Sequence, residues 1–203
     1  MSFGLDLHLF LSTLLTLVVI LDPPGLLPVF LGLTRRLTPA QRNNAAGRGS
    51  LVALGVIAVF AVFGRQILDY LHISVPALQV SGGLLLLLVA LELLMGRDTQ
   101  PRPQDGVNVA IVPLGTPLLA GPGAIVATML AVQGAPSPAG YVTVALALTI
   151  SMLLVYLFLR FAGQIRSLLR ESGTTLASRV AGLLLSAIAV QMMADGVFGF
   201  MGR

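Results

Sequence analysis

The stretch LDPPGLLPVF at residues 21–30 interrupts an apolar run that extends from Leu5 to Leu33. Proline lacks a backbone N–H and its ring clashes with the preceding helical turn, so Pro23 and Pro24 predict the end of one helix. Asp is a favoured N-cap and Pro suits the first helical position, so Asp22 also predicts the start of a second helix. The stretch therefore predicts a helix that is broken in the middle of a hydrophobic segment.

The composition of the chain assigns that segment to a membrane. The 203 residues are 56% hydrophobic and only 10% charged, whereas soluble domains carry about a quarter charged residues. The mean hydropathy is +0.95. The basic residues are all arginines dispersed between apolar blocks, so we expect no nucleic-acid partner. The absence of cysteine excludes disulfides, thiol catalysis and cysteine-ligated metals.

Six apolar segments have the roughly 20 residues that a helix needs to cross the hydrocarbon of a bilayer. The predicted spans are Leu5–Leu33, Asn44–Leu68, Val75–Met95, Val107–Val132, Tyr141–Phe161 and Leu176–Met201. Short polar links with turn residues separate them, and none of these links is long enough to form a soluble domain. The sequence predicts an all-α membrane protein with a single transmembrane domain over residues 1–203.

Arginine sets the predicted orientation, because positively charged residues accumulate in cytoplasmic loops. Ten of the 12 basic residues fall in or beside the links after the first, third and fifth spans. Arg65 and Arg203 are the two exceptions. We therefore expect the arginine-rich loops in the cytoplasm and both termini outside it.

The two halves of the chain share a pattern at a constant offset of 100 residues. Val80, Gly82 and Gly96 are matched by Val180, Gly182 and Gly196, and LDPPG in span one is matched by the interrupted segment PLGTPLLAGPGA in span four. Because each half has three spans, the second half enters the membrane in the opposite orientation. We predict a 3+3 inverted repeat, residues 1–100 and 101–203, with spans one and four broken by Pro and Gly, as in many secondary transporters.

The two breaks form the predicted functional site. A helix break leaves unpaired backbone amides, which are costly in hydrocarbon and must face protein or a water-filled cavity. Two half-helix N-termini also bring partial positive charge toward the centre of the bilayer. The candidate residues for substrate binding or proton coupling are Asp22, Pro23, Pro24 and Gly25 in the first break, Gly121, Pro122 and Gly123 in the second, and Thr116 and Gln191.

Asp22 has two interpretations that the sequence leaves open. A carboxyl group within a span costs about 2.5–3.5 kcal/mol, so its presence requires a reason. Asp22 either only caps its own half-helix, or it also carries a proton or contacts a cationic group of a substrate.

Other polar residues have weaker claims. Gln191 is expected to face the bundle interior, because an uncharged amide needs partners there. Thr116 and Thr128 either donate hydroxyl groups near the second break or bond back to the helix. Asn43 and Asn44 are interpreted as caps of the second span, with a cytoplasmic gate as the alternative. The sequence contains no catalytic grouping, cofactor motif or metal-ligand spacing, so we expect no enzyme activity, cofactor or metal.

The segments DPPGLLPVFLGLT, VPLGTPLLAGPGAI and AVQMMADG resemble the MarC family of bacterial integral membrane proteins, over essentially the whole chain. The resemblance implies six spans in the bacterial inner membrane and a distant relation to LysE-type exporters. The family often has a polar residue after its DPxG motif, where this chain has Leu26 and Leu27. That departure leaves polar recognition at the first break to Asp22 and the backbone.

The leading interpretation is a secondary transporter, an exporter of a small solute that works by alternating access between the two halves. The alternatives are a membrane scaffold or regulator without transport activity, and an intramembrane enzyme acting on lipid, for which a nucleophile–base grouping is lacking. Two aligned helix breaks favour transport, because a scaffold gains nothing from them. The expected partners are the lipid bilayer and a small solute, and the sequence leaves homo-oligomer formation open.

Overall fold

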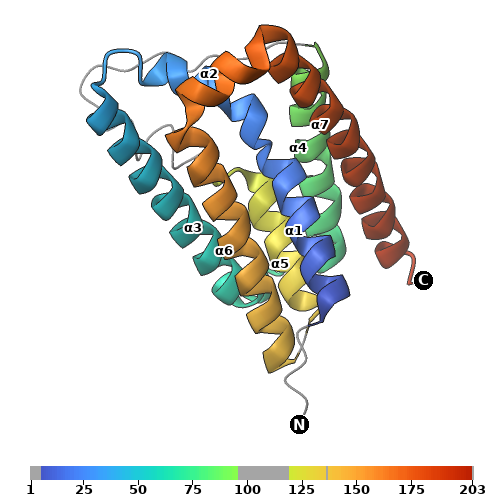
Figure 1. Cartoon of the computed structure of the whole chain (residues 1–203). Helices are drawn as coiled ribbons and strands as arrows, with labels where there is room; N and C mark the ends of the chain where they lie inside the picture. Colours follow the sequence, from blue (N-terminus) through green and yellow to red (C-terminus); the bar gives the residue numbers. More distant parts are fainter. Residues whose placement is uncertain (1–5, 96–118, 136, 203) are drawn as a thin grey trace.

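The computed structural model describes residues 6–95, 119–135 and 137–202, and all regular structure within them is helical (Figure 1). The helices are α1 (Leu7–Leu21), α2 (Pro23–Leu33), α3 (Pro39–Tyr70), α4 (Val75–Met95), α5 (Pro122–Gln133), α6 (Pro138–Arg160) and α7 (Ala162–Phe200). Within the described residues, five helical stretches are long and apolar enough to cross a membrane, and α5 contributes a shorter apolar helix.

The helices alternate in direction through the bundle (Figure 1). α1 and α2 lead from the end near the N-terminus to the opposite end, α3 returns, and α4 crosses again. α5 leads back from the interior, α6 ascends, and α7 passes across the upper end of the view before it descends. The first and last described helical turns therefore lie toward the same end of the molecule.

Two helix starts differ from the predicted spans. α3 begins at Pro39, because Thr38 and Gln41 form a capping box in which each side chain accepts a hydrogen bond from the other residue's backbone N–H. Asn43 and Asn44 lie inside α3 and do not cap it. α7 begins at Ala162, so the link predicted before Leu176 is helical. Residues 162–175, which form this link, contain no proline that would stop a helix.

The closest packing in the bundle joins α4 to α7 through glycines. A Cβ added at Gly83 would lie 2.7 Å from the Ala189 carbonyl oxygen on α7. A Cβ added at Gly182 would lie 3.2 Å from the Ala90 carbonyl oxygen on α4. Glycine lets the two backbones approach as closely as in other transmembrane helix pairs, where dispersion forces and not the hydrophobic effect hold helices together.

Substitution of Gly83 tests this close packing. We expect Gly83→Ala to destabilise the protein by about 1–3 kcal/mol, because the added methyl group meets backbone that cannot move aside cheaply. Gly55→Ala on α3 is the matched control, since a Cβ there meets nothing within 4 Å. It should be neutral or stabilising by roughly 0.5–1 kcal/mol. Thermal unfolding of the detergent-solubilised protein measures both, and equal melting temperatures would contradict the packing described.

Candidate functional site

Asp22 ends α1 and begins α2. Its backbone N–H donates to the Val18 carbonyl at 3.1 Å, and its own carbonyl accepts from the Leu26 N–H at 3.1 Å. Its side-chain Oδ1 accepts from the Gly25 N–H at 3.2 Å. One residue therefore closes the first helix and caps the second, which confirms the predicted stop and start.

The backbone of Asp22 is left-handed, with φ 38° and ψ 66°. This conformation is uncommon for residues other than glycine, although Asp and Asn tolerate it best. Glycine would satisfy the backbone at lower cost, so the carboxyl group is the reason for an aspartate here. That group is held inside the protein, since Asp22 is only 6% exposed.

Gly25 makes room for the carboxyl group over the N-terminus of α2. A Cβ added at Gly25 would overlap Asp22 Oδ2 and would lie 3.0 Å from Ser178 Oγ. The hydroxyl of Ser178, on α7, therefore stands beside the same helix end as the carboxyl group. Sequence reasoning missed Ser178. It lies one turn before Gly182 and so shares the face of α7 that packs inward, which is a signal that the sequence contains.

The second break begins α5 at Pro122, as predicted. Gly121 is its N-cap, with extended backbone (φ −66°, ψ 158°) and no side-chain hydrogen bond to the helix. The Gly121 carbonyl accepts from the Ile125 N–H at 3.2 Å. The amides at the start of this helix are thus left without the side-chain cap that Asp22 gives to α2.

The two breaks lie close together in the core. A Cβ added at Gly123 would overlap Leu86 Cδ2 and would lie 3.5 Å from Ile20 Cγ2, two residues before Asp22. One hydrophobic cluster includes residues from both breaks: Leu21, Leu26, Leu119, Ala120 and Ala124. The arrangement places two half-helix N-termini and one carboxyl group in the same apolar surroundings. Such a site suits a ligand that bonds to backbone amides, or a proton or cation that bonds to the carboxyl group.

Of the remaining candidates, Pro23 and Pro24 belong to the first break. Pro23 is buried and Pro24 half-buried at the first turn of α2. Thr116 lies outside the described residues. Thr128 is buried on α5, where its hydroxyl donates to the Ala124 carbonyl at 2.7 Å, so it bonds back to its own helix. Among the described residues, His, Asp and Glu side chains form no group of three that would hold a metal ion.

The prediction that Gln191 faces the interior is wrong. Its side chain is exposed on α7, where Nε2 donates to Asp195 Oδ1 at 2.7 Å. The inward face of α7 is occupied instead by small and apolar residues such as Gly182 and Ala189, which pack against α4. Gln191 is therefore separate from the paired breaks.

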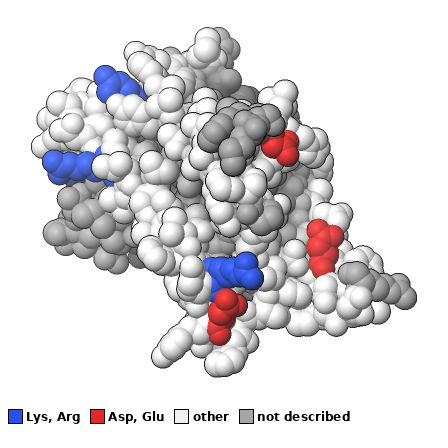
Figure 2. Space-filling model, turned by 90° about the horizontal axis from the view of Figure 1, so that it is seen from below, with Lys and Arg blue, Asp and Glu red and all other residues white. Residues whose placement is uncertain are grey.

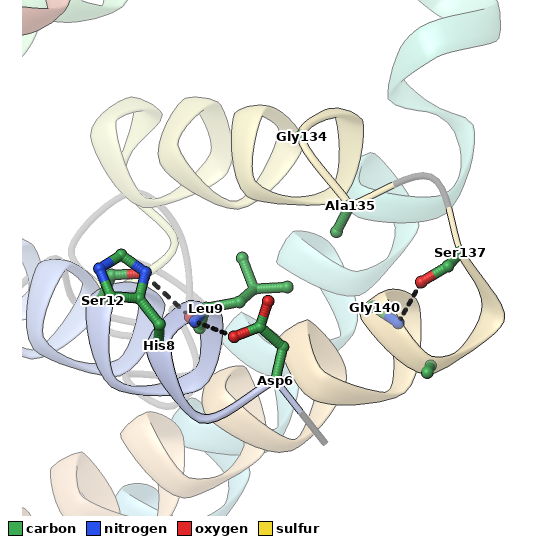
Figure 3. Close-up of a pocket in the computed structure, with 9 residues that line it drawn as sticks. Asp6, His8, Leu9, Ser12, Gly134, Ala135, Ser137 and Gly140 are labelled. Carbon is green, nitrogen blue, oxygen red and sulfur yellow. Dashed lines mark hydrogen bonds between the residues drawn. The ribbon is translucent and has the colours of Figure 1, made fainter. Parts of the chain in front are cut away.

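A pocket of about 480 Å³ opens at the end of the bundle where α1 begins (Figure 3). Figure 3 shows its walls: the start of α1 with Asp6 and Ser12, the end of α5 at Gly134, and the start of α6 with Ser137 and Gly140. Two of its polar side chains already cap helices, since Asp6 accepts from Leu9 N–H and Ser137 from Gly140 N–H, both at 3.0 Å. Sequence reasoning did not identify this pocket, because its walls are far apart in the chain.

Charged side chains are sparse at this end of the molecule. Seen from below, the surface shows a few basic and acidic side chains, one of each sign lying side by side, and is otherwise uncharged over the described part (Figure 2). The arginines that follow α2, begin α3 and end α6 belong to the opposite end of the bundle, namely Arg35, Arg36, Arg42 and Arg160.

Apolar helices of membrane-spanning length, broken around a buried carboxyl group, define a multi-pass integral membrane protein. The chain belongs to the MarC family: residues 7–201 match the family described as MarC family integral membrane protein, which confirms the resemblance.

Relatives of the chain occur in archaea as well as bacteria. It is 35% identical to a UPF0056 membrane protein of Methanocaldococcus jannaschii, over 96% of this chain and 98% of the relative. It is 33% identical to the UPF0056 inner membrane protein YhgN of Escherichia coli, over 92% and 95%. It is 29% identical to the UPF0056 membrane protein YvbG of Bacillus subtilis, over 98% and 97%. No solved structure matches the chain.

Proposed function

We propose that this protein is a secondary transporter that exports a small solute by alternating access between two inverted halves. The observation that carries the proposal is an exchange of half-helices. α2, from the first half, packs against α6 and α7 of the second half, and α5, from the second half, packs against α3 and α4 of the first. Each half-helix N-terminus thus lies where the halves meet, which is where a transporter needs its binding site.

Helix positions support the inverted repeat of residues 1–100 and 101–203. α2 begins at Pro23 and α5 at Pro122, while α3 begins at Pro39 and α6 at Pro138. The equivalent helices thus begin 99 residues apart in both cases (122 − 23 and 138 − 39). Span four, of which α5 is the described part, completes six spans in this proposal.

The α4–α7 pair supports a two-fold relation between the halves. The approaches of Gly83 to Ala189 and of Gly182 to Ala90 centre the antiparallel pair near residues 86 and 186. These two positions are equivalent under the offset of 100 residues. In the proposed transporter, the pseudo-two-fold axis passes between α4 and α7 at this point, near the middle of the bilayer.

The carboxyl group of Asp22 gives the site its coupling chemistry in this proposal. A carboxyl group at a helix N-terminus can bind and release a proton or pair with a cation, while neighbouring amides bind polar groups of the solute. Apart from the O–H bond of the Asp22 carboxyl group, no covalent bond is made or broken in such a cycle. The pocket beside Asp6 and Ser12 is the proposed outer entrance, at the end that carries few charges. The arginine-rich end is then cytoplasmic, as in an inner membrane protein with both termini outside.

Cysteine labelling tests the proposal, because the natural chain contains no cysteine. Ser12→Cys reports on the outer pocket and Ser178→Cys on the inner side of the first break. We expect a membrane-impermeant maleimide to label Ser12→Cys from outside and Ser178→Cys from the cytoplasmic side. A proton gradient that raises one labelling rate should lower the other, because alternating access closes one side when the other opens.

Two exposed positions serve as controls for this experiment. Tyr70→Cys and Ala40→Cys lie at opposite ends of α3, and their labelling rates should stay constant while still reporting the sidedness of each end. Labelling rates at Ser12→Cys and Ser178→Cys that do not change in opposite directions would favour a scaffold or regulator. Labelling of Ala40→Cys from outside would overturn the orientation.

A further inference from the structure

The exposed face of α7 carries a polar pair within an otherwise apolar stripe. Gln191 donates to Asp195 at 2.7 Å, one turn further along the helix. The exposed residues around the pair on the same face are Leu184, Ala187, Val190 and Phe198. Figure 1 shows this half of α7 at the edge of the bundle, beside α4. In a membrane, this face is turned to lipid or to another protein.

The position of the pair along its predicted span places it within the hydrocarbon. α4 and α7 centre on each other near residue 186, which is also close to the middle of the candidate span Thr175–Phe200, so Gln191 is about five residues, or roughly 8 Å, from the expected middle of the membrane. Asp195 is about nine residues, or roughly 14 Å, from it. The hydrocarbon extends about 15 Å on either side. A carboxamide and a carboxyl group at these depths need polar partners, because lipid tails supply none.

The pair cannot turn into the bundle. Gln191 follows Ala189 by two residues, which places it about 200° around the helix from the face that packs on α4. A Cβ added at Gly196 would lie 2.8 Å from the Pro76 carbonyl oxygen, and one at Gly182 would lie 3.2 Å from that of Ala90. A rotation of α7 that buried Gln191 would move Gly182 and Gly196 away from the α4 backbone. Larger side chains would then take their places and clash with it. Within the described residues, the bundle therefore offers the pair no further partner.

We propose that this face of α7 binds the same face of a second copy of the protein, forming a parallel dimer about a two-fold axis along the membrane normal. A carboxamide both donates and accepts hydrogen bonds, so Gln191 is complementary to its own copy. One N–H of Nε2 already serves Asp195. The other N–H and Oε1 bond to Gln191 of the partner subunit, which gives two reciprocal hydrogen bonds across the axis.

The depth of the pair in the membrane favours a second copy of the protein as its partner over an unrelated protein. Two copies inserted with the same orientation place Gln191 at the same height by symmetry, and an isologous interface requires no further match. Ala187, one turn from Gln191 on the exposed stripe, is small enough to let the two helices approach.

Disulfide cross-linking in native membranes tests the dimer. We expect Ala187→Cys to give a covalent dimer on mild oxidation, because the two copies of residue 187 flank the axis. Val59→Cys is the matched control, since Val59 is 53% exposed on α3, away from this face. It should remain monomeric under the same conditions.

The role of Gln191 is tested in the Ala187→Cys background. Gln191→Leu should weaken dimerisation roughly five- to tenfold, as expected for the loss of two hydrogen bonds between membrane helices. Val62→Leu, at an exposed position on α3 away from this face, should leave the cross-linked fraction unchanged. Both variants add apolar surface toward lipid, so both should fold, and size-exclusion chromatography in detergent checks this.

Three results would overturn the dimer. The first is cross-linking of Ala187→Cys no stronger than that of Val59→Cys. The second is a cross-linked fraction that Gln191→Leu does not change. The third is fast labelling of Ala187→Cys by a water-soluble maleimide without cross-linking, which would identify the face as a hydrated opening. None of these results depends on whether the protein transports a solute.

Discussion

Replacing Asp22 with Asn is expected to abolish coupled transport while leaving the fold intact. Asn caps helices about as well as Asp and tolerates the left-handed backbone that residue 22 adopts. The hydrogen bond from the Gly25 N–H can therefore persist with the amide oxygen as acceptor. The variant lacks the titratable charge, so any step that binds a proton or a cation at this position is lost.

Solute pools measure the effect before the substrate is known. Cells that produce Asp22→Asn should show the same metabolite pools as cells without the protein, whereas wild-type cells should differ from both. The melting temperature in detergent should stay within about 4 °C of wild type, or rise slightly, since an amide is cheaper to bury than a carboxylate. Asp69→Asn is the control, because Asp69 is exposed near the end of α3 and belongs neither to the breaks nor to the pocket. Wild-type pools in Asp22→Asn would reduce Asp22 to a cap.

Gly25→Ala is expected to inactivate the protein with little loss of stability. The added methyl group overlaps Asp22 Oδ2, a side-chain atom that can move by rotation about the Asp22 side-chain bonds. The carboxyl group then leaves the N-terminus of α2, and the charge that the proposed cycle uses is displaced. The helix itself gains a better helix former, which offsets part of the lost cap.

Gly32→Ala on the same helix is the matched control for Gly25→Ala. A Cβ at Gly32 meets nothing within 4 Å, so this variant should keep wild-type solute pools and stability. In the double variant Asp22→Asn with Gly25→Ala, the second change should cause no further loss of activity, because both act through the same carboxyl group. Wild-type activity in Gly25→Ala would show that the position of this group does not matter.

The broken helix could be predicted from sequence because its signals are local. Two consecutive prolines remove donors and exclude the preceding turn, and an Asp before them supplies the cap, so three residues fix the break. The same logic located the start of α5 at Pro122. The start of α7 could not be read, since residues 162–175 are too polar for a span but contain no proline that would end a helix.

Which side of each helix is buried was harder to predict than where the helices begin and end. A membrane helix is apolar on all sides, so hydrophobic periodicity gives little contrast between its buried and exposed faces. Gln191 was misplaced for this reason. The informative pattern on α7 is the seven-residue spacing of small residues at Gly182, Ala189 and Gly196, which marks the packed face and leaves Gln191 on the other. Ser178 and the pocket beside Asp6 depend on contacts between distant segments, which the sequence pattern does not give.

The exchange of half-helices has a consequence for biogenesis. Leu27 and Phe30 of α2 are fully buried. The helices that pack over α2 are α6 and α7, and these begin only at Pro138 and Ala162. At about 5–20 residues per second, the ribosome needs roughly 5–20 s to synthesise the hundred or so residues between them. During that interval α2 is a short, capped segment in the membrane without its final neighbours. The first half therefore cannot reach its native structure during synthesis, and the site is assembled only when the last helix has been inserted.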